Sequence, residues 1–249
     1  MSQSTFPVRE GQNVPQVSFR VRRNGDWATV TTDEIFGNKN VVVFSLPGAY
    51  TPTCSSTHLP RFNELWPAFK AQGIDAIVCL SVNDPFVMEA WGQDQEADNV
   101  FLLADGNGEF TEKMGLLVDK SDLNFGKRSW RYSMLVRNKR IEKQFIEPQE
   151  PGDPFKVSDA DTMLAYINPS ASKPDQVAIL TREGCSFCAK AKRALKEAGY
   201  DYVELPLPHT IRSRAVGAIA GSGTVPQVFI NGRLIGGAED LDAYLRRAA

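Results

Sequence analysis

Short runs of apolar residues alternate along the chain with longer stretches in which apolar residues recur at helical spacing. In the first part of the chain the two strongest runs, VVVFSL and IDAIVCLSV, predict strands buried on both faces. Strands are expected there at 41–46, 74–82, 100–104, 131–136 and 140–146. Helices are expected at 61–72, 85–93 and 158–167. This alternation is typical of an α/β fold.

The second part of the chain repeats the pattern on a smaller scale. Its predicted strands are at 177–180, 202–205, 227–230 and 233–235. Its predicted helices are at 185–198, 211–220 and 239–247. Asn231-Gly232, between the last two strands, predicts a two-residue hairpin turn. The resulting order, β-α-β-α-β-β-α, indicates a small sheet with helices layered on it.

A segment without apolar periodicity, NPSASKPD at 168–175, separates the two parts. Its proline, serine and alanine content is typical of a linker. We therefore expect a first domain at 1–167, a linker at 168–174 and a second domain at 175–249. The acidic, proline-rich stretch at 147–154 precedes a capped helix that we assign to the first domain.

The composition excludes several classes of protein. Of the 249 residues, 42% are hydrophobic and 23% are charged, as in an ordinary globular protein. Lys and Arg number 28 against 30 Asp and Glu, and this net charge of −2 argues against a nucleic-acid-binding protein. No apolar run approaches the roughly 18 residues that cross a bilayer, so no membrane association is expected. The polar stretch 1–10 lacks the apolar core of a signal peptide, which favours a cytoplasmic location.

Thiol groups are the main candidates for chemistry. The four cysteines are Cys54, Cys79, Cys185 and Cys188. They are too few for a disulfide scaffold, and a reducing compartment keeps cysteines for chemistry or burial. A tetrahedral metal site needs four ligands at recognisable spacing, which one close cysteine pair and two histidines do not supply. We therefore expect no metal.

Cys54 follows the strand at 41–46 and lies near the start of a helix. The unpaired N–H groups and the dipole of a helix start favour a thiolate, which is the nucleophilic form of cysteine. Thr51 offers a hydroxyl to a substrate, and Pro47 and Pro52 stiffen the loop. The alternative, a small residue in a turn, fits less well because structural free cysteines usually have apolar neighbours.

The segment PGAYTPTCS, with its P-x-x-x-T-x-x-C core, resembles the peroxidatic motif of peroxiredoxins, in particular the peroxiredoxin-5 type. The resemblance extends to THLP, IVCLSVND and RYSM, and covers about the first 165 residues. It implies that Cys54 attacks the O–O bond of a hydroperoxide and becomes a sulfenic acid, while Thr51 hydrogen-bonds the peroxide. It also implies that Arg131 stabilises the thiolate and polarises the substrate, and that Pro47 shields the site from water.

Other residues near the motif have competing interpretations. Without the resemblance, Arg131 would be taken for a surface arginine, and Arg128 is a nearby competitor for its role. We interpret His58 as structural and Cys79 as an inert core thiol, with a resolving role as the minor alternative. No cysteine lies between Arg131 and Asp175, so an external thiol is the expected reductant of a sulfenic acid.

Cys185 and Cys188 form a C-x-x-C pair at a second junction between a strand and a helix. The first thiol is expected to be exposed near free N–H groups, and the second to lie one turn inward, where it can close a disulfide. Lys190, Lys192 and Arg193 add positive potential. Half of a zinc site is the alternative, but the chain has no second pair, so redox chemistry is favoured.

Two further motifs follow the pair, TVP and GG-x-x-DL, and with CSFC they resemble glutaredoxin over about residues 175–249. A proline before a strand is compatible with either a cis or a trans bond, and glycines at a helix start let a ligand approach the backbone. The resemblance implies a glutathione site formed by Val225, Pro226, Gly237, Ala238, Glu239 and Asp240. Arg182 and Arg212 are candidates for binding the other carboxylate of glutathione, with solvated surface charges as an equal alternative.

Together the two resemblances imply two thioredoxin-fold domains, a larger peroxiredoxin-like one and a smaller glutaredoxin-like one. They imply a glutathione-dependent thiol peroxidase that reduces hydrogen peroxide and organic hydroperoxides at Cys54 and is recycled by Cys185 and Cys188. Glutathione is then the reducing cosubstrate, and no permanently bound cofactor is expected. By resemblance we also expect a homo-oligomer, a dimer or a tetramer. The alternatives are a glutathione-dependent disulfide reductase and a redox sensor without sustained turnover.

Overall fold

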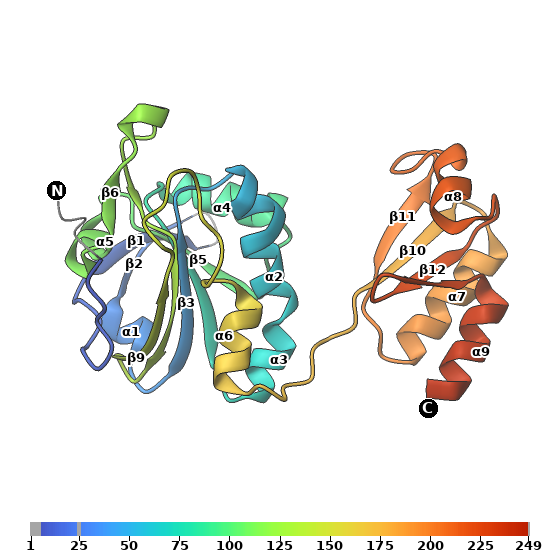
Figure 1. The fold of residues 1–249 in the computed structure, drawn as a ribbon, viewed down its shortest axis with the longest axis horizontal. Coiled ribbons are helices and arrows are strands. Elements are labelled where there is room, and N and C mark those ends of the chain that lie inside the picture. The colour runs from blue at the N-terminus through green and yellow to red at the C-terminus, as the bar shows by residue number, and fades with distance from the viewer. Residues whose placement is uncertain (1–5, 24–25, 249) are drawn as a thin grey trace. The chain divides into compact units, whose positions relative to one another are not determined.

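The computed structural model describes residues 6–23 and 26–248, so the first five residues of the polar stretch 1–10 lie outside the described residues. The chain divides into two compact units, the first ending at Lys173 and the second beginning at Pro174. Each unit has a central sheet with helices on it (Figure 1). The layered α/β fold predicted from the sequence is therefore confirmed.

The first unit is built on a sheet of five strands in the order β5-β4-β3-β8-β9. Their bounds are β3 (Asn40–Leu46), β4 (Ala76–Ser81), β5 (Val100–Ala104), β8 (Tyr132–Arg137) and β9 (Arg140–Ile146). Strands β3, β4 and β5 are parallel, whereas β8 runs antiparallel to β3 and β9. Successive side chains of β3 enter different cores, since Phe44 packs on one face of the sheet and Val43 on the other.

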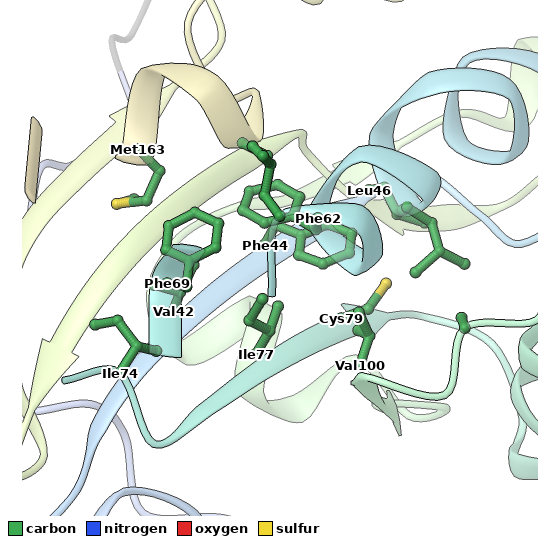
Figure 2. Packing of buried hydrophobic residues seen from close by; sticks show 14 of the residues in the cluster. Val42, Phe44, Leu46, Phe62, Phe69, Ile74, Ile77, Cys79, Val100 and Met163 are labelled. Carbon is green, nitrogen blue, oxygen red and sulfur yellow. The ribbon is translucent and has the colours of Figure 1, made fainter. Parts of the chain in front are cut away.

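Helices cover one face of this sheet, and a hairpin with two short helices covers the other (Figure 1). The first layer contains α2 (Leu59–Glu64), α3 (Trp66–Ala71), α4 (Pro85–Asp94) and α6 (Ala160–Ile167). Figure 2 shows its core, where the ring of Phe44 stacks on that of Phe62 with 4.2 Å between centroids. The second layer contains β1 (Ser18–Arg23), β2 (Asp26–Thr31), α1 (Thr32–Phe36) and α5 (Glu109–Met114).

Several of these elements differ from the sequence-based expectation. The single helix predicted at 61–72 is two helices joined at Leu65, because Pro67 in the first turn of α3 has no N–H to continue the α2 ladder. The second layer was not predicted, although the alternation of buried Phe19 and Val21 is a strand signal. A small hairpin of β6 (Leu117–Asp119) and β7 (Lys127–Ser129), with a 3₁₀ turn η2 (Ser121–Leu123) between its strands, was also missed.

The second unit has a sheet of four strands in the order β11-β10-β12-β13. Its elements are β10 (Val177–Arg182), α7 (Ser186–Glu197), β11 (Val203–Leu207), α8 (Ser213–Ala220), β12 (Gln227–Ile230), β13 (Arg233–Gly236) and α9 (Ala238–Ala248). This confirms the predicted order of strands and helices. Helices α7 and α9 pack on one face around Ile179, and α8 packs on the other through Val216 (Figure 1). Within the described parts of both units, no helix is long and apolar enough to cross a bilayer.

A bidentate ion pair joins two helices of the first layer. Arg61 of α2 donates from Nε and Nη2 to the two carboxylate oxygens of Asp161 in α6, at 2.7 and 2.9 Å. Lys173 also contacts Asp161. The hydrogen bond from Arg61 is the main reason that the pKa of Asp161 falls from 3.8 to about 2, against the opposing effect of burial.

We predict that Asp161→Asn destabilises the first unit at neutral pH. The folded carboxyl group has the lower pKa, so its contribution is present above the unfolded value of 3.8 and is lost as the pH falls to about 2. Because the side chain is 37% exposed, we expect only about 1 kcal/mol at pH 7.

Denaturant unfolding at pH 7 and pH 3 measures this difference. Glu112→Gln, which removes an exposed carboxylate from α5, is the control and should change stability by less than about 0.5 kcal/mol. A loss for Asp161→Asn that is equally large at both pH values would contradict the assignment.

Candidate active site

The loop that carries Cys54 begins where β3 ends. Pro47 follows directly and is buried. Asn83, after β4, holds the loop in place, since its side-chain oxygen accepts from the backbone N–H of Ala49 at 3.0 Å and from the hydroxyl of Ser81 at 2.7 Å. The loop therefore has a fixed path from the sheet edge to the helix that follows.

Cys54 lies in the first turn of that helix, which begins at Pro52. From Cys54 to His58 the helix has π geometry, and the N–H of Leu59 bonds to the carbonyl of Cys54. Pro60 gives a physical reason, because a proline within a helix lacks a donor and its ring crowds the preceding turn. Widening the turn before Pro60 relieves this conflict. The Cys54 side chain is fully buried (0% exposed).

Thr51 lies just before the helix. Its hydroxyl donates to the carbonyl of Gly48 at 2.9 Å, and its own carbonyl accepts from the N–H of Ser55 at 3.0 Å. The backbone of Thr51 thus starts the helical ladder, while its side chain closes the turn that follows Pro47. The hydrogen of the Thr51 hydroxyl is thus used in the bond to Gly48, whereas the hydroxyl oxygen can still accept a hydrogen bond from another donor.

Strand register brings Arg131 to the same end of the sheet. Ser45 of β3 pairs with Tyr132 of the antiparallel strand β8, so Arg131 lies at the edge where the loop to Cys54 begins. Its Nη2 contacts the sulfur of Cys54 at 3.5 Å. The side chain is only 1% exposed, so the sequence-based alternative of a surface arginine is wrong.

His58 contacts the same guanidinium from inside the core. Nη1 of Arg131 lies 3.0 Å from Nδ1 of His58, and Nε2 of His58 lies 3.2 Å from the carbonyl of Ser158. Because a guanidinium only donates, Nδ1 must accept, and the imidazole hydrogen sits on Nε2 and donates to Ser158. Burial, and then the charge of Arg131, hold the pKa of His58 well below its usual range. His58 is therefore a neutral acceptor in this site.

The sulfur of Cys54 and the carboxylate of Asp153 both contact the guanidinium of Arg131. Asp153 accepts from Nη2 at 2.5 Å and from Nε at 3.3 Å. Burial opposes the charged form, but the attraction of Cys54 and the contacts with Asp153 outweigh it and raise the pKa of Arg131. A permanent positive charge next to a buried sulfur favours the thiolate and can stabilise charge on a departing oxygen.

Two other sequence-based alternatives have clear places in the structure. Arg128 donates to the carbonyls of Val82 and Phe125, at 2.6 and 2.9 Å, and not to Cys54. Cys79 lies in the core of β4 (Figure 2), where burial raises the pKa of its thiol well above the ordinary value, and Cys54 adds to this effect. A neutral, enclosed thiol of this kind is unreactive.

Sequence reasoning missed two residues of this site, Asp153 and Glu147. Both belong to the acidic, proline-rich stretch 147–154, to which the sequence analysis gave no role in this site. Glu147 is 1% exposed, and its carboxylate accepts from three backbone N–H groups and one hydroxyl of Lys156, Val157 and Ser158. No short-range motif links Asp153 to Arg131 in the sequence. The acidic residues of this stretch were the signal from which a buried carboxylate that organises the loop could have been inferred.

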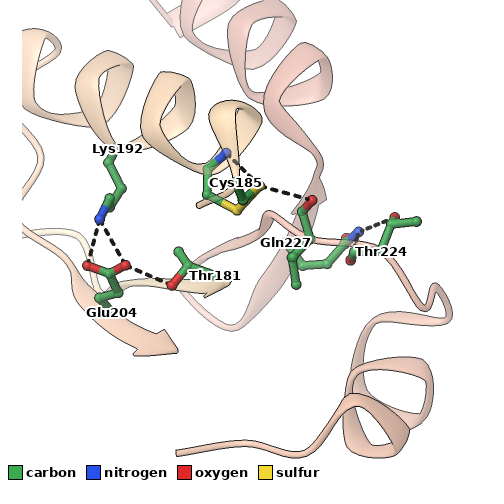
Figure 3. The surroundings of a disulfide bond; sticks show 8 residues. Thr181, Cys185, Lys192, Glu204, Thr224 and Gln227 are labelled. Atoms are coloured by element: carbon green, nitrogen blue, oxygen red, sulfur yellow. Dashed lines mark hydrogen bonds and ion pairs between the residues drawn. A yellow bond between two sulfur atoms is a disulfide. The ribbon is translucent and has the colours of Figure 1, made fainter. Parts of the chain in front are cut away.

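The second candidate site lies at the start of α7 (Figure 3). Cys185 is the N-cap of the helix, and its sulfur accepts from the N–H of Cys188 at 3.1 Å. The two cysteines form a disulfide with Cα atoms 5.2 Å apart. Cys185 is half-buried and Cys188 is 2% exposed, as expected for an outer and an inner thiol.

Two loops approach this pair. The sulfur of Cys185 lies 3.8 Å from the carbonyl of Val225, and the bond between Val225 and Pro226 is cis. The loop before α9 lies beside it, since a Cβ on Gly237 would be 3.8 Å from the carbonyl of Pro226. The structure thus brings together the residues of the CSFC, TVP and GG-x-x-DL motifs.

The remaining candidate residues have different surroundings. The carboxylate of Asp240 is exposed and accepts from the N–H of Gly237 at 2.9 Å, so it caps α9. Glu239 is exposed, and Ala238 is buried at the helix start. Arg182 is exposed and lines a hollow beside Cys185 with Lys192 and His209. Arg212 is the exposed N-cap of α8.

A metal site needs several ligand side chains close together. Among residues 6–23 and 26–248, no group of three or more His, Cys, Asp or Glu side chains is arranged to hold a metal ion.

Comparisons with known proteins identify both units. A family model described as Redoxin matches residues 9–164, and one described as Glutaredoxin matches residues 177–235. The chain is 59% identical over 235 residues to a hybrid peroxiredoxin from Haemophilus influenzae, which covers 94% of this chain and 98% of that protein.

Solved structures resemble the first unit. Reduced Prx3 from Vibrio vulnificus, in complex with hydrogen peroxide, is 38% identical with a TM-score of 0.61, over 65% of this chain and 99% of that one. A Plasmodium falciparum antioxidant protein described as a 1-Cys peroxiredoxin is 31% identical with a TM-score of 0.63, over 66% of this chain and 100% of that one. The chain therefore belongs to the redoxin family, as a peroxiredoxin of thioredoxin fold, a thiol peroxidase, that carries a C-terminal glutaredoxin domain.

Proposed function

We propose that the chain is a glutathione-dependent peroxidase that reduces hydrogen peroxide and organic hydroperoxides at Cys54. The observation that carries this proposal is the 3.5 Å contact between the sulfur of Cys54 and a guanidinium that is 1% exposed. A buried positive charge beside a sulfur favours the thiolate, and the thiolate is the form that attacks an O–O bond.

In the first step, the Cys54 thiolate attacks one peroxide oxygen, and the O–O bond breaks. Cys54 becomes a sulfenic acid, and the other oxygen leaves as water or an alcohol after taking up a proton. Arg131 stabilises the charge that develops on the leaving oxygen. Thr51 binds the peroxide once its hydroxyl turns away from Gly48, and buried Pro47 keeps bulk water from the sulfur.

In the second step, glutathione condenses with the sulfenic acid, water is released, and a mixed disulfide forms on Cys54. Cys185 then attacks the glutathione sulfur, which returns Cys54 as a thiolate. A second glutathione releases glutathione disulfide from Cys185, or Cys188 displaces the first one and closes the internal disulfide. The separation of 5.2 Å between the two Cα atoms supports the second route, because it lies in the usual disulfide range.

The enclosure of Cys54 adds a requirement to this cycle. Hydrogen peroxide is small, but glutathione is a tripeptide and cannot reach a sulfur that is 0% exposed. The first turn of the helix, from Pro52 to His58, therefore has to open before the mixed disulfide forms. Its π geometry supports this step, because π turns occur mostly at functional sites.

Glutathione is proposed to bind the second unit between its two loops. Val225 and Pro226 pair with the peptide backbone, and Gly237, Ala238 and Glu239 hold the γ-glutamyl end at the start of α9. Asp240 supports the loop through its bond to Gly237. The exposed guanidinium of Arg182, near Cys185, is suited to the remaining carboxylate.

We also propose a domain division at 1–167 and 175–249, with 168–174 as a flexible linker. Such a linker raises the effective concentration of Cys185 near Cys54 to about the millimolar range. A homo-oligomer, a dimer or a tetramer, is proposed from the family alone.

A coupled assay separates this function from its rivals. With hydrogen peroxide, glutathione, glutathione reductase and NADPH, we expect sustained NADPH oxidation that falls to background in Cys54→Ser and falls strongly in Cys185→Ser. Each variant removes one nucleophile of the cycle. A redox sensor would consume one equivalent of peroxide and stop. A disulfide reductase would keep its activity in Cys54→Ser with a disulfide substrate and show no peroxide turnover in the wild type.

A second prediction concerns the guanidinium. Arg131→Lys keeps a positive charge but not the planar set of donors that contacts Cys54, His58 and Asp153 together, so we expect Cys54 oxidation to slow by about 100-fold. Stopped-flow measurement of the reduced chain with hydrogen peroxide gives this rate. Arg128→Lys is the matched control, since Arg128 donates to the carbonyls of Val82 and Phe125 and not to Cys54. Equal losses in both variants would argue against a specific role for Arg131.

A further inference from the structure

The segment 147–158 contacts the guanidinium of Arg131. Asp153 forms two hydrogen bonds to it, and the ring of Phe155 lies 5.5 Å from its central carbon. The other edge of the Phe155 ring faces His58, with 4.9 Å between ring centroids. The arginine is thus enclosed between the π turn and this segment.

The buried carboxylate of Glu147 gives the segment its shape. One oxygen accepts from the N–H groups of Val157 and Ser158 and from the Ser158 hydroxyl, and the other accepts from the N–H of Lys156. Glu147 is itself tied to the sheet, because its N–H bonds to the carbonyl of Arg131 at 3.1 Å. The segment is therefore anchored at the residue whose side chain Asp153 contacts.

A single nitrogen of Arg131 is shared by two acceptors. Nη2 lies 2.5 Å from Oδ2 of Asp153 and 3.5 Å from the sulfur of Cys54. A guanidinium is planar, so its N–H directions are fixed relative to one another. When the carboxylate holds one Nη2 hydrogen and the Nε hydrogen, the other Nη2 hydrogen has a single direction, which is toward the sulfur.

We propose that Asp153 is a positioning residue for peroxide reduction: it orients Arg131 so that the guanidinium faces Cys54. This inference rests on the proposed function of Cys54 and Arg131. Asp153 does not touch the reacting sulfur and acts only through the arginine.

The burial of the two partners distinguishes this pair from an ordinary surface salt bridge. Arg131 is 1% exposed, while the side chain of Asp153 is 41% exposed. A buried cation has to be hydrogen-bonded, and loss of its carboxylate leaves it with two fewer acceptors. Surface pairs, in which both partners keep their water, are worth little. Asp153 therefore determines the orientation of the buried guanidinium of Arg131.

The charge of Asp153 and its geometry act in opposite directions on Cys54. Its negative charge lies on the same nitrogen as the thiolate and so disfavours a second anion there. Its hydrogen bonds hold the donor that the thiolate and the leaving oxygen need. Asp153→Asn removes the charge and keeps the shape of the side chain. The rate of oxidation of fully ionised Cys54 then reports the effect of orientation separately from the effect on ionisation.

The experiment is the pH dependence of Cys54 oxidation by hydrogen peroxide in the reduced full-length chain, with Cys54→Ser as background. For Asp153→Asn, we expect the plateau rate to fall by about 10-fold or more, since a misdirected group costs that much. The removed charge and the lost orientation shift the acid midpoint of the profile in opposite directions, so the plateau rate, at which Cys54 is fully ionised, is the quantity that tests the proposal. Thiolate absorbance at 240 nm reports the same midpoint without peroxide.

Glu150→Gln is the matched control. Glu150 is an exposed carboxylate of the same segment that pairs with Lys156 and not with Arg131, so its variant should keep the plateau within twofold. A plateau within twofold for Asp153→Asn, with Cys54→Ser inert, would overturn the positioning role and leave the proposed function intact. Full activity in Cys54→Ser would instead overturn the proposed function.

A conservative variant completes the test. Asp153→Glu keeps the carboxylate and lengthens the side chain, and a partly exposed position leaves room for it to reach the guanidinium. We expect it to recover at least a third of the wild-type plateau. If Asp153→Glu is folded, by its thermal unfolding, and is as slow as Asp153→Asn, orientation by the carboxylate is not the cause and the proposal fails.

Discussion

A buried guanidinium has to be surrounded by acceptors, and this requirement organises the first unit. Arg131 is 1% exposed and is held by the thiol sulfur of Cys54, the neutral imidazole of His58 and the carboxylate of Asp153. The π turn supplies two of them, and the segment organised by Glu147 supplies the third. The same arrangement that satisfies the charge also places it 3.5 Å from the sulfur of Cys54.

The sheet makes this arrangement possible. Strands β3 and β8 are antiparallel with Ser45 opposite Tyr132, so the end of one strand and the start of the other lie at one edge. The loop to Cys54 leaves from that edge, and Arg131 enters there. The second unit uses a simpler device, in which Cys185 sits at a helix start and is half-buried. The proposed cycle assigns the reaction with a small oxidant to the enclosed sulfur of Cys54 and disulfide exchange to the more accessible sulfur of Cys185.

Local features were predictable and long-range partners were not. The strand-to-helix junctions at Cys54 and Cys185 could be predicted because a buried apolar run, a short loop and a helix start lie next to each other in the sequence. The contact of Asp153 with Arg131 could not, because it depends on the return of a loop that Glu147 organises through backbone groups. The π turn before Pro60 was missed for a different reason: a proline in a helical stretch indicates a conflict but not how the backbone resolves it.

The most direct test of this account is to find the oxygen that peroxide leaves behind. The fully reduced chain is treated with one equivalent of hydrogen peroxide in the presence of dimedone, which traps sulfenic acids, and the modified peptide is identified by mass spectrometry. The account predicts one adduct, on the peptide that contains Cys54, at close to one per chain. An adduct mainly on Cys185, Cys188 or Cys79, or no adduct while peroxide is consumed, would contradict it.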